Sequence, residues 1–105
     1  IQISCLEINF DLPAYDKICF FENCKKDQFY RFDISSEKYF VNVEYKIPSE
    51  VMNRAYSTLI FKKSFTSSSE EEFKVCIYST SDSKQNIKFN FASGINAKDF
   101  GDIIS

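Results

Sequence analysis

A chain of 105 residues has room for one domain and no more. Its 44% apolar and 17% aromatic residues can form a packed core, which excludes a disordered chain. The formal net charge is −2, with 13 basic and 15 acidic residues scattered along the sequence, so no basic face is available and we expect no nucleic-acid partner.

Apolar and polar residues alternate in short segments from the beginning of the chain, which is the pattern of half-buried β-strands. The clearest stripe begins at Tyr39 and ends at Pro48. After a loop over 49–54 we expect two weaker strands, and further stripes follow near the end of the chain. The predicted strands cover 6–10, 18–22, 30–34, 39–47, 56–61, 64–67, 73–77 and 87–91.

About eight short strands, one roughly every ten residues, predict a β-sandwich or a barrel. We expect an all-β, antiparallel β-sandwich of the jelly-roll type over residues 1–93. Past Gly94 the sequence pattern differs from that of the preceding strands, and we predict a linker or the start of a coiled coil over residues 94–105. The predicted core consists of the in-phase residues Phe10, Phe32, Tyr39, Val41, Val43, Val75, Ile77, Phe89 and Phe91.

The sequence offers little for catalysis. It contains no His, so the usual general base is missing and no Ser–His or Cys–His pair can form. With glycines only at 94 and 101, no glycine-rich phosphate loop exists. The adjacent Glu70, Glu71 and Glu72 are more typical of a solvated loop than of a cation site. We expect no enzyme, no catalytic residue, no metal and no cofactor.

Four cysteines in a short chain without His favour disulfides over zinc, with buried free thiols in a cytosolic protein as the alternative. Cys19 and Cys76 lie in an early and a late predicted strand. A bridge between them closes a loop of about 58 residues, worth about 4 kcal/mol by the chain-entropy model. Because Cys76 is out of phase with Val75 and Ile77, the bridge should join neighbouring strands. The immunoglobulin pattern does not fit, because the chain lacks Trp and has Lys74 in place of the corner Tyr.

A second disulfide, between Cys5 and Cys24, is a further hypothesis. If the first two strands meet around the turn at 13–16, these two cysteines lie at about the same height. Bridging would require their Cα atoms to lie within about 7 Å of each other.

Several motifs along the chain together resemble the GOLD domain of the p-twenty-four family of transmembrane cargo receptors. The family has an apolar strand ending in Leu-Pro, then Cys-Phe-aromatic-Glu, an aromatic-x-Val-x-Val strand with a following Pro, a Cys-bearing strand, and a closing glycine before Ala-Lys-Asp-Tyr. The chain departs from the pattern at Lys63, where the family has Phe, and at Glu50 and Glu71, where glycines are expected. The matching segments are 9–13, 19–22, 39–43, 47–48, 65–66, 73–77, 89–91, 94 and 97–100.

The resemblance implies the lumenal domain of a type I membrane protein that cycles between the endoplasmic reticulum and the Golgi. It implies an oxidising compartment, a Cys19–Cys76 disulfide, and a membrane span outside this sequence. Cys5 and Cys24 are extra to the family pattern. The implied partners are protein cargo and paralogous receptor subunits.

The alternative function is a secreted adhesion or lectin-like β-sandwich. In either case we expect the domain to act by recognition through its surface. The exposed edge strands of a sandwich are natural docking sites for another chain. We expect weak self- or hetero-association, with the isolated domain monomeric at micromolar concentration.

Overall fold

The computed structural model describes residues 4–48 and 50–94. Eight β-strands form this part of the chain, and it contains no helix. In chain order the strands are β1 (Ser4–Leu12), β2 (Lys17–Asn23), β3 (Phe29–Ser36), β4 (Val41–Lys46), β5 (Asn53–Thr58), β6 (Ile60–Thr66), β7 (Glu72–Ser79) and β8 (Gln85–Gly94).

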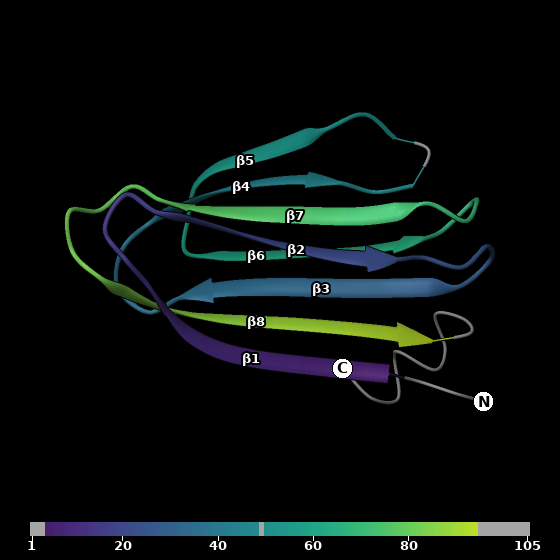
Figure 1. The fold of residues 1–105 in the computed structure, drawn as a ribbon, viewed down its shortest axis with the longest axis horizontal. Coiled ribbons are helices and arrows are strands. Elements are labelled where there is room, and N and C mark those ends of the chain that lie inside the picture. Colours follow the sequence, from purple (N-terminus) through teal and green to yellow (C-terminus); the bar gives the residue numbers. More distant parts are fainter. Residues whose placement is uncertain (1–3, 49, 95–105) are drawn as a thin grey trace.

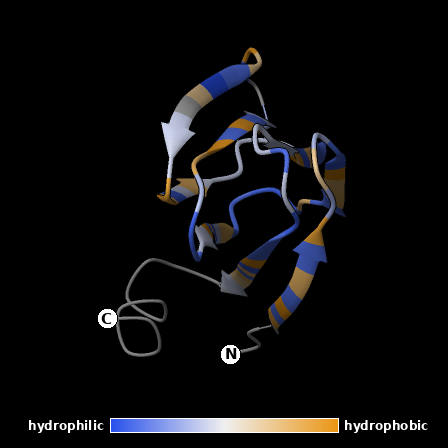
Figure 2. Ribbon diagram, turned by 90° about the vertical axis from the view of Figure 1, so that its left-hand side faces the viewer, coloured by the Kyte–Doolittle hydropathy of each residue, from blue (hydrophilic) through white to orange (hydrophobic). Residues whose placement is uncertain are grey.

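The strands form two four-stranded antiparallel sheets that pack face to face (Figures 1 and 2). Sheet A has the order β1-β8-β3-β6, and sheet B has the order β2-β7-β4-β5. Eight strands shared between two sheets, with most connections crossing from one sheet to the other, make a jelly roll. The predicted all-β antiparallel sandwich is confirmed.

The core lies between the sheets and consists of alternate residues from each strand, as period-2 patterning requires. Seven of the nine predicted core residues are buried: Phe32, Val41, Val43, Val75, Ile77, Phe89 and Phe91. Phe10 and Tyr39 are only partly buried. Phe10 lies on the edge strand β1, while Tyr39 precedes β4 and so lies outside the sheet. Buried aromatics that the predicted core omitted are Tyr30, Tyr45, Phe65 and Phe73.

Aromatic rings join the two sheets across the core. Phe89 of sheet A stacks on Phe20 of sheet B, with ring centroids 4.4 Å apart and planes inclined by 5°. Phe32 of sheet A and Phe73 of sheet B have centroids 4.9 Å apart. Such ring pairs add to the stabilisation that burial of their area supplies. The high aromatic content is therefore explained by the packing of the two inner faces.

The predicted single strand over 56–61 is wrong, because the chain crosses from sheet B to sheet A within it. Leu59 separates β5 from β6, and its carbonyl accepts a hydrogen bond of 2.8 Å from the amide of Ser36. The end of β5 is irregular: the register shifts between Val41 and Val43, and Ser57 has φ of 54°. The side-chain oxygen of Asn42 accepts a hydrogen bond of 3.1 Å from the Ser57 amide and so stabilises this bulge.

The last strand extends to Gly94, which lies opposite Phe29 in sheet A. Gly94 therefore belongs to the sandwich and not to the linker predicted over 94–105. Residues 95–105, where the helix start and the linker were predicted, lie outside the described residues. The described residues include no helix long and apolar enough to cross a membrane.

Candidate functional site

A disulfide joins Cys19 of β2 to Cys76 of β7 on the outer face of sheet B. The two residues lie directly opposite each other in the antiparallel pair, with Cα atoms 4.1 Å apart. Val75 and Ile77, on either side of Cys76, both lie in the core. The bridge therefore joins neighbouring strands within one sheet, as the phase of Cys76 predicted.

The hypothetical Cys5–Cys24 disulfide is wrong, because Cys24 is a free, buried thiol. The hypothesis required the first two strands to pair, and they lie in different sheets. Cys5 lies opposite Ala92 in sheet A, whereas Cys24 follows the end of β2 in sheet B. The crossing of the chain at the first turn separates these two positions.

The pKa of the Cys24 thiol is raised from an ordinary 9.0 to about 11, first by burial and second by the nearby Glu22 carboxylate. Below pH 9 the thiol is neutral in both folded and unfolded chains. Between pH 9 and 11 it ionises only after unfolding, so its contribution to stability is lost as pH rises through this window. We expect the free energy of unfolding to fall more steeply over this window than in Cys24→Ala. Denaturant titrations at several pH values measure both slopes, and parallel curves would contradict the assignment.

The outer face of sheet B carries side chains that interact with one another. Glu44 forms a salt bridge of 2.8 Å with Arg54 and accepts a hydrogen bond of 3.3 Å from the Tyr78 hydroxyl. The ammonium groups of Lys17 and Lys74 lie over the rings of Tyr78 and Phe21. These contacts, together with the disulfide, make a face whose polar groups largely pair with each other.

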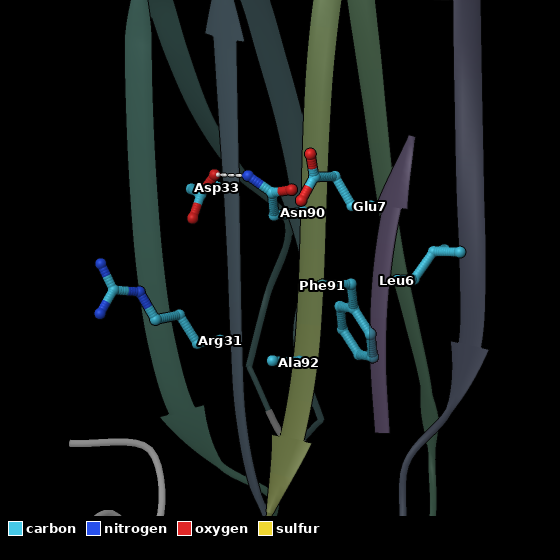
Figure 3. A pocket seen from close by; sticks show the side chains of 7 residues that line it. All are labelled: Leu6, Glu7, Arg31, Asp33, Asn90, Phe91 and Ala92. Carbon is cyan, nitrogen blue, oxygen red and sulfur yellow. Dashed lines mark hydrogen bonds between the residues drawn. The ribbon is translucent and has the colours of Figure 1, made fainter. Parts of the chain in front are cut away.

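A hollow of about 200 Å³ opens on the outer face of sheet A, over β1, β8 and β3 (Figure 3). Glu7, Asn90 and Asp33 form one row across these strands, because each is the register partner of its neighbour. In the next row Arg31 lies opposite Ala92, whose small side chain leaves room for the hollow. Leu6 and Phe91 complete the lining.

Asn90 is the central polar group of the hollow. Its amide nitrogen donates a hydrogen bond of 2.8 Å to Asp33, while its buried amide oxygen has no partner among the described residues (Figure 3). With the carboxylates of Glu7 and Asp33 and the guanidinium of Arg31, the hollow can accept and donate hydrogen bonds. These groups equip the hollow to recognise a polar ligand or a polar side chain.

In the predicted strand over 30–34, alternation turns Arg31 and Asp33 away from the apolar face, but it does not bring Asn90 or Glu7 next to them. The missing information was the order of the strands, because β1, β8 and β3 are far apart in the chain. No group of three or more Asp, Glu, His or Cys that could hold a metal ion occurs in the described part of the chain, the run at Glu70 included.

Comparisons with known proteins agree with this architecture. A family model described as emp24/gp25L/p24 family/GOLD matches residues 7–105. The comparison with curated proteins gave no match. Among solved structures, the chain is similar to the crystal structure of Aeromonas hydrophila PliG, a periplasmic lysozyme inhibitor of g-type lysozyme. The TM-score is 0.56 at 13% sequence identity, over 86% of this chain and 84% of that chain. At this identity the similarity concerns the fold alone.

Proposed function

The chain belongs to the emp24/gp25L/p24 family, and we propose that it is the lumenal, protein-binding GOLD domain of a receptor that cycles between the endoplasmic reticulum and the Golgi. In this role it selects protein cargo and takes part in receptor oligomerisation. The family match over residues 7–105 carries the proposal. The Cys19–Cys76 disulfide supports a lumenal setting, because such bonds persist in oxidising compartments.

The surface of the domain supports binding as its mode of action. The hollow on sheet A presents hydrogen-bonding groups to solvent, and both sheets end in edge strands. Edge strands present unpaired backbone groups to which another chain can pair. Weak contacts suffice where a membrane anchor or a stalk holds several copies together, since tethering raises the effective concentration toward the millimolar range.

Affinity purification of the full-length protein tests this proposal. We expect an epitope-tagged protein, solubilised from membranes of the early secretory pathway, to recover other family members and secretory cargo. A matched variant that lacks residues 7–94 should lose most of these partners. Protease treatment of intact vesicles should leave the domain protected. Equal recovery of partners without the domain, or digestion of the domain in intact vesicles, would overturn the proposal.

A further inference from the structure

Four edge strands border the sandwich, and three of them carry features that oppose pairing with another chain. On β2, Glu22 lies opposite the buried Phe73 and therefore on the inner face. On β6, Lys63 lies opposite the buried Phe32 and likewise faces inward. The bulge with Ser57 at positive φ distorts β5. Inward-facing charges and bulges are two ways in which natural sheets protect their edges.

The remaining edge strand, β1, has no such protection. Its nine residues pair with β8 in an unbroken register from Ser4 to Leu12, without proline or bulge. Its inner-face residues between these ends are all apolar, namely Leu6, Ile8 and Phe10. The opposite edge of β1 pairs with no strand among the described residues. A long, regular and uncharged inner stripe makes β1 the edge best suited to accept another strand.

A small and mostly apolar slot lies beside β1. Its volume is about 50 Å³, and its lining consists of apolar residues, Leu6, Phe20, Phe21, Phe73, Phe89 and Phe91, together with the charged Glu22. Leu6 is 46% exposed and Phe21 is 56% exposed, so apolar surface remains open to solvent here. A strand added to β1 would place alternate side chains next to this slot, because successive residues of a strand point to opposite faces.

The outer face of β1 is acidic. Glu7 and Asp11 alternate with Asn9, and the strand contains no Lys or Arg. Lys84 lies 3.6 Å from Asp11 in an exposed pair, whereas Glu7 forms no ion pair within the described part of the chain. Opposite charges on neighbouring strands stabilise their pairing, and like charges oppose it. The outward residues of an added strand should therefore be basic.

We propose that β1 accepts an extended segment of a partner protein in which apolar residues alternate with Lys or Arg, and this inference rests on the proposed protein-binding function. The apolar residues lie over Leu6 and the slot, and the basic residues lie beside Glu7 and Asp11. Main-chain hydrogen bonds to β1 supply affinity, and the two side-chain stripes supply specificity.

A second copy of this chain fits the edge less well. Antiparallel pairing of two β1 strands sets the stripe of Glu7, Asn9 and Asp11 against itself, and no register gives an opposite-charge pair. Pairing of β1 with β6 of another copy would bring the inward-facing Lys63 next to the apolar inner-face residues of β1. Because both self-pairing arrangements are unfavourable, we expect the strand that binds β1 to come from a different protein.

Peptide binding to the 105-residue chain tests the proposal. The probe is a fluorescent nine-residue peptide of alternating Val and Lys, compared with the peptide in which Glu replaces Lys. Fluorescence anisotropy should show binding of the Lys peptide that weakens about five- to tenfold in Glu7→Lys, since an attractive cross-strand pair becomes repulsive. The matched control Glu70→Lys makes the same charge change on an exposed loop and should bind like the unmodified chain.

Two peptides with N-methyl groups on alternate residues test the backbone pairing. Each set of methyl groups blocks the amide donors along one edge of the peptide, so one peptide should retain binding and the other should lose it. Thermal unfolding of Glu7→Lys, an exposed position, checks that the variant is folded. Equal binding of the Lys and Glu peptides, equal binding of both methylated peptides, or absence of binding would overturn the β1 proposal. Failure of the proposed receptor function would appear instead in the purification and protease experiments on the full-length protein.

Discussion

Truncation of Phe89 to Ala is expected to lower the free energy of unfolding by about 3–5 kcal/mol, the range for buried Phe-to-Ala changes. Phe89 is 1% exposed, stands between Ile8 and Ile34 in sheet A, and stacks on Phe20 of sheet B. Its removal would leave a cavity where the two sheets meet, and the paired backbone on both sides limits the collapse that could fill it.

Lys88→Ala is the matched control, because Lys88 is the preceding residue of the same strand and lies exposed on the outer face. Its effect should stay within about 0.5 kcal/mol, as for most surface substitutions. Denaturant unfolding without reductant measures both variants under the same conditions. A loss under about 0.5 kcal/mol in Phe89→Ala would contradict the packing that places this ring between the sheets.

Period-2 patterning made most of the fold predictable because the strands bury one face each. Val41 and Val43 alternate with Asn42, and the structure buries the two valines. The pattern failed where tertiary geometry overrides alternation. Leu59, Ile60 and Phe61 form a continuous apolar run, yet the chain passes from sheet B to sheet A at Leu59. The hydrogen bond from the Ser36 amide to the Leu59 carbonyl marks this crossing, and the sequence pattern does not indicate it.

The candidate sites were less predictable, because they depend on which strands become neighbours. Glu7, Asp33 and Asn90 are ordinary outward residues in the sequence, and sheet order alone gathers them. The same ignorance of sheet order produced the incorrect pairing of Cys5 with Cys24, since adjacent strands in the sequence were assumed to pair. The Cys19–Cys76 bridge was easier to predict. The family resemblance implied the pairing, and the phase of Cys76 in its strand predicted a bridge between neighbouring strands.

Removal of the Cys19–Cys76 disulfide is the second change with a large expected effect. The bond links residues separated by 57 positions, and the chain-entropy model assigns such a loop about 4 kcal/mol through restriction of the unfolded chain. We expect Cys19→Ala/Cys76→Ala to unfold with a free energy lower by about 2–5 kcal/mol. The folded sandwich should persist, because the bridge lies on the outer face of sheet B and the core residues are unchanged.

Reductant separates the effect of the bond from the effect of the substituted side chains. If the bond carries the stabilisation, the unmodified chain should lose nearly the same free energy when reduced, and the double variant should not respond to reductant. Cys24 is a thiol in both proteins, so it contributes equally to the comparison. Intact-mass analysis of the unmodified chain, alkylated under denaturing conditions, counts its reactive thiols. Reduction should add two reactive thiols, one at Cys19 and one at Cys76. An unmodified chain whose unfolding is insensitive to reductant would show that the two strands are held by their ladder and packing alone, and it would remove the bond as support for an oxidising compartment.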